Sequence, residues 1–187
     1  MVKVMAGERF LKMEGLGGEV PFFIYPYDPL DALEVEASKK RIQTKLNQKG
    51  IQVCEVNLYD LVVKLLAERG VWEQLIEIEP HTPKIDFREG LRSMLDPGDD
   101  LAPAIREILA RQAHDILFLT GIGEVFPFIR SHNVLNNLQT VAGEKPMLMF
   151  FPGRYEQSQS LGSSLVLFGV VKDDQYYRAK DIRDQEA

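Results

Sequence analysis

The chain has 187 residues, of which 45% are hydrophobic and 27% are charged, and its formal net charge is −6 at pH 7. These values predict one globular domain with a substantial core, and the acidic balance disfavours DNA or RNA as the main partner, because phosphate binding needs a clustered basic face. The single cysteine, Cys54, rules out an internal disulfide and indicates a reducing compartment. No segment has the apolar length of a membrane span or the pattern of a signal peptide, so we expect a cytoplasmic protein.

The first predicted strand and the first long helix follow each other directly. The apolar run VPFFIY at 20–25 predicts a buried strand, and the apolar spacing over 33–49 predicts a helix that ends at Gly50. The other face of this helix is basic and consists of Lys39, Lys40, Arg41, Lys45 and Lys49. Such a run could contact nucleic acid, but we interpret it as a solvated helix face, which is the usual role of a charge run.

A second strand and a second helix are predicted from residue 51 onward. Residues 51–58 alternate as a strand, and Asn57 near its end suits the N-cap of the helix that follows. Asp60 falls in the first turn of that helix, where a negative charge is favoured by the helix dipole. The helix carries an apolar stripe and ends at Gly70.

The chain from 71 to 113 keeps a helical period throughout. This stretch is too long for one crossover between strands, so it predicts a helical insertion. Asp86 followed by Glu89 predicts a helix start, as a variant of the capping box. Pro97 and Gly98 predict a break before the last helix of the insertion. The apolar face of that helix consists of Leu101, Ile105, Ile108 and Leu109.

Three further strands are predicted in the remainder of the chain. Residues 115–121 form the continuous apolar run that is typical of a strand buried on both faces of a parallel sheet. A helix is predicted over 130–142, a fourth strand over 145–153, where Pro-Gly closes it, and a fifth strand over 163–171. The polar stretch 154–163 between the last two strands is long for a hairpin loop, so we expect a loop there.

Alternating strands and helices indicate the α/β class. We expect a mostly parallel sheet of about five strands flanked by helices, with the helical insertion over about 71–113. The charged tail over about 173–187 is expected to fray. The order of elements resembles a nucleotide-binding α/β core.

The phosphate-binding chemistry of such a core is absent from the sequence. Gly121 and Gly123 follow the predicted central strand, where open α/β sheets bind ligands, but position 126 holds phenylalanine where a dinucleotide fingerprint has a third glycine. No Gly-Lys-Ser/Thr triplet occurs anywhere in the chain. After the first strand, Pro26 and Pro29 remove backbone donors and Asp28 repels phosphate. We therefore predict an α/β core that lacks a P-loop.

Arg130, Ser131 and His132 form a polar run at the start of a predicted helix. Adjacent helical residues point about 100° apart, so Ser131 and His132 cannot pair as nucleophile and base. We interpret Ser131 as a helix cap and His132 as a local hydrogen-bonding group, with a polar interaction surface as the alternative. Arg130 opposes the helix dipole, which favours a carboxylate partner for it, either Asp28 or Glu124 in this chain or a residue of a binding partner.

Catalytic, cofactor-binding and metal-ligating residues are not expected. The three histidines, His81, His114 and His132, show no pair at ligand spacing. We expect instead a set of interaction or ligand-edge residues, with no cofactor. They are Tyr25, Asp28, Gly121, Gly123, Arg130, Ser131, His132, Asn136 and Asn137.

Several segments taken together resemble the BrxB family of bacterial BREX (bacteriophage exclusion) systems. They are GLGGEVPFFIYPYDP, NLYDL, LDP, FLTGIGEVFPFIRSHNVLNNLQ, KPMLMFFPGRY, QSLGSSLVLFG and DDQYYRA, and together they extend from about Glu8 to Ala179. The two most specific blocks contain the first strand with its PYDP turn and the PFIRSH segment. The stretch 154–163 is longer than the family pattern, so the resemblance says least about the role of this stretch.

The resemblance implies a role in defence against phages. BREX systems mark self DNA by adenine methylation through a separate methyltransferase and block the replication of unmarked phage DNA. The implied partners are a PglZ-type protein similar to alkaline phosphatase, the large ATPase and the methyltransferase, with the PglZ-type protein as our first choice. A homodimer is a further expectation, while direct DNA binding and membrane contact are not expected. The family implies no catalytic residues, so an adaptor is predicted, with a degenerate nucleotide-binding or nucleic-acid-binding regulatory subunit as the alternative.

Overall fold

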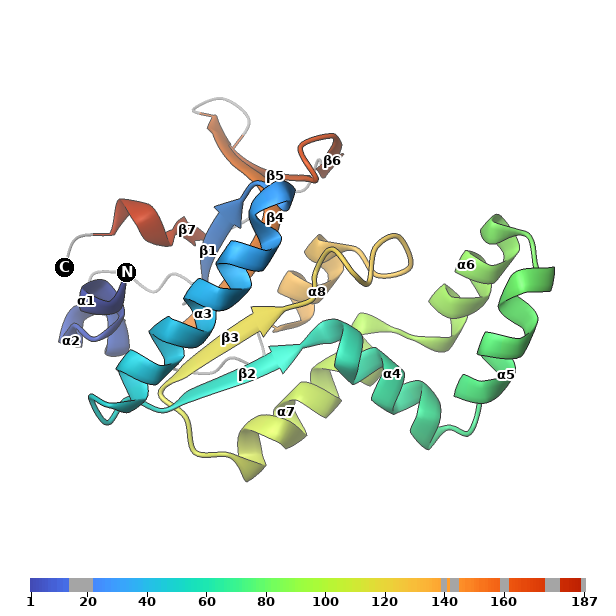
Figure 1. Ribbon diagram of the computed structural model, residues 1–187, viewed down its shortest axis with the longest axis horizontal. Helices are drawn as coiled ribbons and strands as arrows, with labels where there is room; N and C mark the ends of the chain where they lie inside the picture. Colours follow the sequence, from blue (N-terminus) through green and yellow to red (C-terminus); the bar gives the residue numbers. More distant parts are fainter. Residues whose placement is uncertain (14–21, 139–140, 142–144, 159–161, 174–178, 186–187) are drawn as a thin grey trace.

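The computed structural model describes residues 1–13, 22–138, 141, 145–158, 162–173 and 179–185, and it contains a parallel sheet with helices on both faces (Figure 1). The parallel strands lie in the order β2-β3-β4-β1-β7. Their bounds are β1 Phe22–Tyr27, β2 Val53–Asn57, β3 Ile116–Thr120, β4 Met147–Ser158 and β7 Lys180–Asp181. The predicted α/β class with a mostly parallel sheet is confirmed.

Strand β3 lies inside the sheet, as its unbroken apolar run predicts. Leu117 is in register with Cys54 of β2 on one side and with Met147 of β4 on the other. All five residues of β3 are buried. Successive side chains point to opposite faces, so Leu117 and Leu119 belong to one core cluster while Phe118 belongs to the other.

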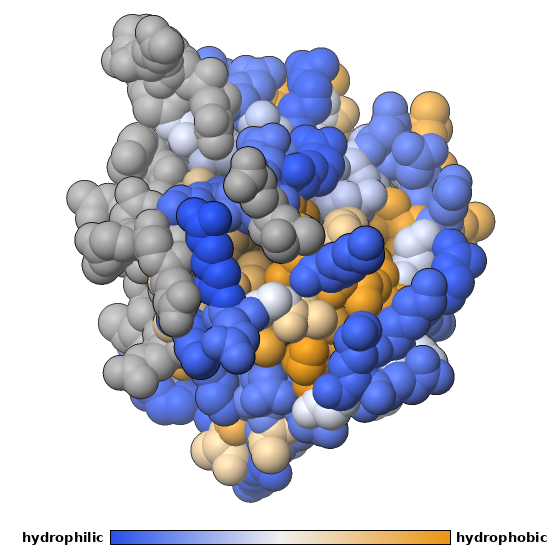
Figure 2. Space-filling view, turned by 90° about the vertical axis from the view of Figure 1, so that its left-hand side faces the viewer, coloured by the Kyte–Doolittle hydropathy of each residue, from blue (hydrophilic) through white to orange (hydrophobic). Residues whose placement is uncertain are grey.

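One face of the sheet is covered by the amino-terminal helices and by α3. The bounds here are α1 Val2–Met5, α2 Glu8–Leu11, the 3₁₀ turn η1 Pro29–Asp31 and α3 Ala32–Asn47. Phe10 packs on Phe23 of β1, with ring centroids 4.6 Å apart, and Leu46 of α3 is fully buried. Figure 2 shows the side of the molecule where α1 and α2 lie, with apolar side chains at its centre and hydrophilic ones around them.

The other face is covered by the helices that follow β2 and β3. Their bounds are α4 Leu58–Glu68, α5 Trp72–Ile78, η2 Glu79–His81, α6 Lys84–Met94, the π turn η3 Pro97–Leu101, α7 Ala102–Arg111 and α8 Ser131–Leu138. The predicted helical stretch after residue 71 is confirmed, and α5 and α6 project away from the sheet at the right of Figure 1. The predicted start at Asp86 is wrong, because α6 begins two residues earlier after Pro83 and has no side-chain cap.

Strand β4 continues beyond the parallel sheet. It runs through Pro152 and Gly153 to Ser158 and pairs in antiparallel fashion with β5 (Gly162–Leu167), which in turn pairs with β6 (Val171–Asp173). The predicted end of the strand at residue 153 is therefore wrong, and the predicted loop is wrong for residues 154–158 and 162–163, while residues 159–161 lie outside the described ones. Gly153 lies opposite Leu167 in the hairpin, so the Pro-Gly pair bends the strand without ending it.

The segment near the carboxyl terminus packs against β1. Lys180 and Asp181 form β7 beside β1, and the 3₁₀ turn η4 (Ile182–Asp184) follows. Ile182 is 1% exposed and belongs to the core cluster on the α3 face. The expectation that the tail frays is wrong for residues 180–184, while residues 174–178 and 186–187 lie outside the described ones. Within the described part of the chain, no helix is long and apolar enough to cross a membrane.

Candidate functional site

A crevice of about 760 Å³ lies at the carboxyl ends of the strands. Its walls come from α3, the start of α4, the ends of β1, β2 and β3, and the turn after β3. The residues that define its chemistry are Tyr27, Glu36, Lys39, Lys40, Glu55, Asn57, Asp60, Thr120, Gly121 and Glu124. Open α/β sheets bind ligands in this position, because connections that leave on opposite faces open a space between them.

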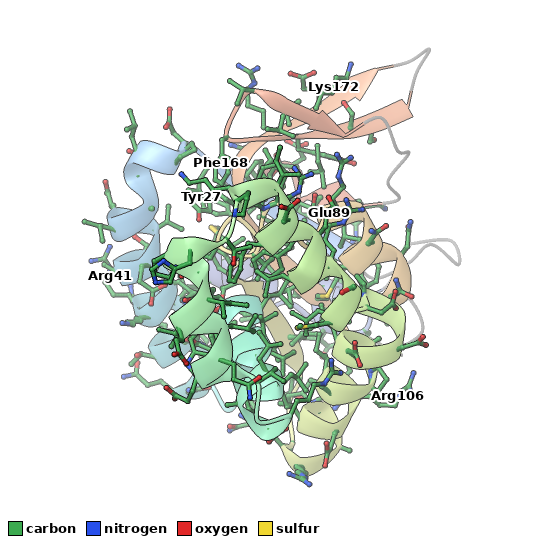
Figure 3. All side chains as sticks on the ribbon, turned by 90° about the vertical axis from the view of Figure 1, so that its right-hand side faces the viewer. Tyr27, Arg41, Glu89, Arg106, Phe168 and Lys172 are labelled. Atoms are coloured by element: carbon green, nitrogen blue, oxygen red, sulfur yellow. The ribbon has the colours of Figure 1, made fainter. Side chains whose placement is uncertain are left out.

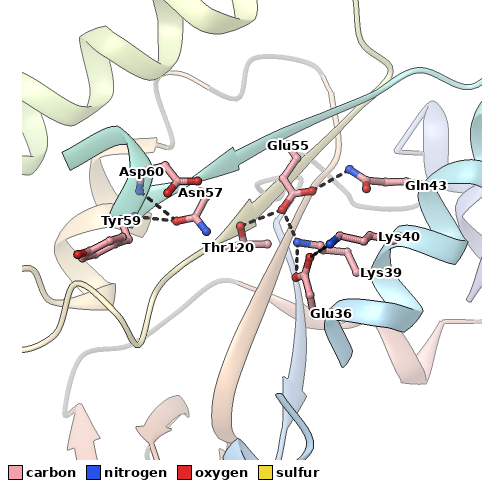
Figure 4. A network of polar contacts seen from close by, with 9 residues as sticks. All are labelled: Glu36, Lys39, Lys40, Gln43, Glu55, Asn57, Tyr59, Asp60 and Thr120. Carbon is pink, nitrogen blue, oxygen red and sulfur yellow. Dashed lines mark hydrogen bonds and ion pairs between the residues drawn. The ribbon is translucent and has the colours of Figure 1, made fainter. Parts of the chain in front are cut away.

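A network of charged and polar groups fills one wall of the crevice, as Figure 4 shows. The ammonium group of Lys39 contacts Glu36 at 2.6 Å and also pairs with Glu55. Glu55 in addition accepts hydrogen bonds from Gln43 Nε2 at 2.9 Å and from Thr120 Oγ1 at 3.2 Å. The network thus ties α3 to β2 and β3, and its cation is already engaged by two carboxylates.

Lys39 itself corrects the interpretation of the basic helix face. Its side chain is 5% exposed, whereas that of Lys40 is 72% exposed. Val35, Ile42 and Leu46 form the inward stripe of α3, and Lys39 occupies the i+4 position of that stripe. This spacing was the available sequence signal for its burial. The partner, Glu55, lies in the next strand at a position that alternates with the buried Cys54 and Val56.

The charges in the network reinforce one another. Burial lowers the pKa of Lys39, but the hydrogen bonds and charges of Glu36 and Glu55 outweigh it and raise the pKa above its ordinary value. Burial raises the pKa of Glu36, and Lys39 and Lys40 outweigh this effect, so the net pKa is lowered. Both groups therefore stay charged near neutral pH. A lysine held in this state is a poor general base and has little capacity left for a phosphate.

Two other titratable groups near the crevice remain protonated. Burial, followed by the charges of Glu124 and Glu36, raises the pKa of Tyr27. Burial, followed by the charge of Glu55, raises the pKa of the Cys54 thiol, which removes it as a nucleophile. Among the described residues, no group of three or more histidine, cysteine or acidic side chains could hold a metal ion.

The turn after β3 meets the start of α4 at the crevice floor. Asn57 Oδ1 accepts hydrogen bonds from the backbone N–H groups of Tyr59 at 2.8 Å and Asp60 at 3.3 Å, so its predicted role as N-cap is confirmed. Gly121 has φ +76°, and a Cβ there would lie 2.4 Å from Asn57 Oδ1. Gly121 is therefore needed because the turn after β3 passes close to the start of α4. This explains the glycine without any contact to a phosphate.

The place where a P-loop would follow the first strand holds an acidic turn. Asp28 Oδ1 accepts a hydrogen bond from Leu30 N at 2.9 Å and so caps η1. Asp28 is exposed and lines a second hollow, of about 630 Å³, that also borders Phe168 and Gly169. The backbone N–H groups that a phosphate would need are thus either missing at the prolines or already used by the aspartate.

The loop from Gly121 to Arg130 packs on the turn between β5 and β6. A Cβ at Gly123 would lie 2.9 Å from both Phe168 and Pro152, and Phe126 meets Phe168 edge-on with ring centroids 6.2 Å apart. Arg130 is exposed beside this hairpin and forms no ion pair with a described residue, so neither Asp28 nor Glu124 is its partner.

The remaining predicted residues are spread over three places. Ser131 is buried and is the first residue of α8. Asn136 is exposed, and Asn137 donates to the carbonyl of Asn133 at 2.7 Å and packs against Gly98 of η3. Tyr25 lies on the α3 face, where it meets Tyr27 and Phe150. His132 belongs to α8, and its side chain lies outside what the structure describes.

Sequence reasoning missed the exposed apolar residues at this edge of the sheet. Leu30 and Leu33, at the start of α3, are 93% and 88% exposed. Val170, in the turn between β5 and β6, is 79% exposed, and Phe168 beside it is 40% exposed. The available signal was the position of Leu30 and Leu33 outside the inward stripe of the helix.

The BrxB family model, described as "BREX protein BrxB", matches residues 54–182. The chain belongs to the BrxB family. The BREX protein BrxB of Bacillus cereus (strain H3081.97) is 39% identical over 183 residues, which covers 94% of this chain and 90% of that protein. The BREX protein BrxB of Escherichia coli O9:H4 (strain HS) is 30% identical over 172 residues, which covers 92% of this chain and 82% of that protein. No solved structure matches the chain significantly.

This BrxB-family chain is therefore a component of the BREX phage defence system. The match begins at Cys54, so it includes the Asn57 cap, the insertion, the loop before α8 and the hairpin. The two curated relatives extend the likeness over nearly the whole chain, which includes β1 and α3.

Proposed function

We propose that this chain acts in BREX defence as a non-catalytic adaptor that binds another BREX protein. The observation that carries the proposal is the state of the sheet's carboxyl edge, where α/β enzymes place their reacting groups. Here the buried lysine is paired with two carboxylates, and the edge exposes Leu30 and Leu33 beside charged side chains. Exposed apolar groups beside charged ones are typical of a surface that contacts another protein.

The PglZ-type protein is the proposed partner, and Arg130 is the proposed polar contact. Arg130 is exposed and has no carboxylate partner among the described residues, so its guanidinium group is available for a bidentate pair with a partner's carboxylate. The methyltransferase and the large ATPase are the other BREX proteins that the same experiment can detect.

The test is affinity purification of the tagged chain from a host that carries a complete BREX system. We expect the PglZ-type protein to be retained, and retention to fall when Arg130→Ala is used although the melting temperature is unchanged. Phage protection is expected to fall in parallel. Arg106→Ala is the matched control, because Arg106 is exposed on α7, far from Phe168 and Lys172 (Figure 3).

The outcomes separate the parts of the proposal. If the wild-type chain retains no BREX protein, the adaptor function is wrong. If it retains only a different BREX protein, the choice of partner is wrong. If Arg130→Ala is fully stable and fully protective, Arg130 has no part in docking.

The crevice itself favours one alternative, a regulatory subunit that binds a nucleotide without hydrolysing it. Its volume of about 760 Å³ and its position at the strand ends suit a small molecule. Thermal unfolding with and without nucleotides distinguishes the two functions. If the chain binds a nucleotide, a concentration of 100 times the Kd adds about 2.7 kcal/mol to the free energy of unfolding. If it is the adaptor that we propose, nucleotides leave the free energy of unfolding unchanged, and this is the result we expect.

A further inference from the structure

The turn η1 and the first turn of α3 each present a leucine to solvent. Leu30 and Leu33 are the most exposed large apolar side chains among the described residues, at 93% and 88%. They do not belong to the inward stripe of the helix, since Val35 and Ile42 pack on the sheet instead. The fold therefore does not use these two leucines, and their burial would need another molecule.

A second apolar element lies across a hollow from these leucines. The hollow of about 630 Å³ has Asp28 and Pro29 on one wall and Phe168 and Gly169 on the other. Val170, next in the chain, is 79% exposed. The loop before α8 supports the turn between β5 and β6, because Phe126 of that loop meets Phe168 edge-on. Leu30 follows Pro29 and Val170 follows Gly169, so both lie next to this hollow, while Leu33 lines the adjoining crevice of about 760 Å³.

The charges on the α3 side of this surface are all negative. Asp28, Asp31 and Glu34 are exposed, and within the described part of the chain none of them forms an ion pair. Three cations nearby are already paired: Lys40 contacts Glu36 at 3.3 Å, Arg154 contacts Glu156 at 3.6 Å, and Arg183, which lines the hollow, pairs with Asp181. The uncompensated charge at the start of α3 is therefore negative.

We propose that this surface docks a basic amphipathic segment of a partner protein. The docking surface consists of Leu30, Leu33, Phe168 and Val170, bordered by Asp28, Asp31 and Glu34. Apolar side chains of the segment would cover the leucines, and lysine or arginine side chains beside them would meet the three carboxylates. The inference rests on the proposed adaptor function and adds the surface and the chemistry of the partner.

The same charges exclude the other classes of occupant. Nucleic acid and an anionic lipid surface would meet uncompensated carboxylates, which repel phosphate. A second copy of this chain, docked by the same surface about a two-fold axis, would bring Asp31 and Glu34 against their own equivalents. A protein segment with both apolar and basic side chains satisfies both parts of the surface.

The first experiment compares three double variants, purified with the BREX protein that the wild-type chain retains. Leu30→Ser with Leu33→Ser removes the apolar contact, and Asp31→Lys with Glu34→Lys reverses the charge. Glu73→Lys with Glu77→Lys is the matched control, because both glutamates are exposed on α5, outside the docking surface. We expect the first two variants to bind at least about tenfold more weakly and the control to bind normally. Lysines at the N-terminus of α3 oppose the helix dipole, so the charge reversal lowers the melting temperature slightly, and binding is compared well below the melting temperature of every variant.

The results also distinguish this inference from the adaptor function. If the wild-type chain retains no partner, the adaptor function fails first. If a partner is retained and both surface variants bind normally, the adaptor function stands and this surface is wrong. If only the leucine variant weakens binding, the surface is correct but a basic partner segment is wrong. Binding that is equally strong at low and high salt would also contradict charge complementarity.

A crosslinking experiment identifies the segment directly. Cys54 is the single cysteine and is buried, so Leu30→Cys gives one accessible thiol to which a photo-crosslinker can be attached. Mass spectrometry of the crosslinked complex then gives the sequence of the partner segment. We expect apolar residues with lysine or arginine beside them. A crosslinked segment that is acidic, or a crosslink to a second copy of the chain, would overturn the proposal.

Discussion

The ammonium group of Lys39 lies between the carboxylates of Glu36 and Glu55, and each charge depends on the others. The lysine side chain is 5% exposed and that of Glu55 is 26% exposed, so little water is available to replace a lost partner. A buried ion pair is costly to form and more costly to break, because the remaining charge stays uncompensated. The network therefore fixes the position of α3 on β2.

Replacing Lys39 by methionine is expected to destabilise the fold strongly. Breaking a fully buried pair costs about 3–5 kcal/mol, and the partial exposure of Glu55 reduces our expectation to about 2–3 kcal/mol, measured by urea unfolding. Lys40→Met is the matched control on the same helix. Because its side chain is 72% exposed, it should cost less than about 1 kcal/mol. Equal small losses in both variants would contradict the role of Lys39.

The stability difference between the wild type and Lys39→Met is expected to depend on pH. The pKa of Glu36 is lowered from 4.5, so its contribution to stability is present above that value and is lost as the pH falls through the lower folded value. The pKa of Lys39 is raised from 10.5, so its contribution is present below that value and is lost as the pH rises through the folded value. The stability difference between wild type and Lys39→Met should therefore narrow in acid and in strong alkali. A constant difference in urea unfolding series across pH would contradict this.

Gly121→Ala is expected to destabilise the junction of β3 and α4. The new Cβ would overlap the Asn57 cap, and φ +76° adds strain of about 1–2 kcal/mol for a residue with a side chain. Gly70→Ala is the control, because Gly70 has φ +71° but open space around it. We expect thermal unfolding to show a larger loss for Gly121→Ala, since only this change displaces the cap. Identical losses would mean that the backbone conformation alone matters.

At the scale of the elements, β3 is buried along its whole length. Leu117 and Leu119 are 2% and 0% exposed on a strand with a neighbour on each side. Truncation of either to alanine is expected to cost roughly 2–5 kcal/mol in denaturant unfolding. Leu33→Ala, at a side chain that is 88% exposed, should change stability by less than about 0.5 kcal/mol. Losses under about 1 kcal/mol for both strand variants would contradict the burial of β3.

Local patterns in the sequence predict the elements whose causes are local. The N-cap at Asn57 and the continuous apolar run of β3 depend on residues that lie close together, so both could be found from the sequence. The course of β4 past Pro152 depends on pairing with β5, and the burial of Lys39 depends on Glu55 in another element. β7 is only two residues long, too short for any periodic pattern. The docking surface was missed because only the fold brings the segments of Leu30 and Val170 to the same hollow.

For the molecule as a whole, the paired state of the crevice predicts that the purified chain has no ATPase, nuclease or phosphatase activity. No P-loop can form after β1, and the described residues offer no candidate metal site. The assays should include wild type and the Asp28→Ala variant at equal concentrations. A rate above background that co-purifies with the chain and falls in the variant would contradict this expectation.

The strand order also determines when the sheet can be completed during synthesis. Among the described strands β1 is made before the others, but its two neighbours are β4 and β7, and Phe22 pairs with Met147. β2 and β3 are adjacent in the sheet and become available earlier. Pairing between segments so distant in sequence is slow to form and leaves apolar surface exposed in the meantime. The apolar β1 segment therefore has no partner strand until residues 147–152 have been made, and its other edge stays open until β7 follows.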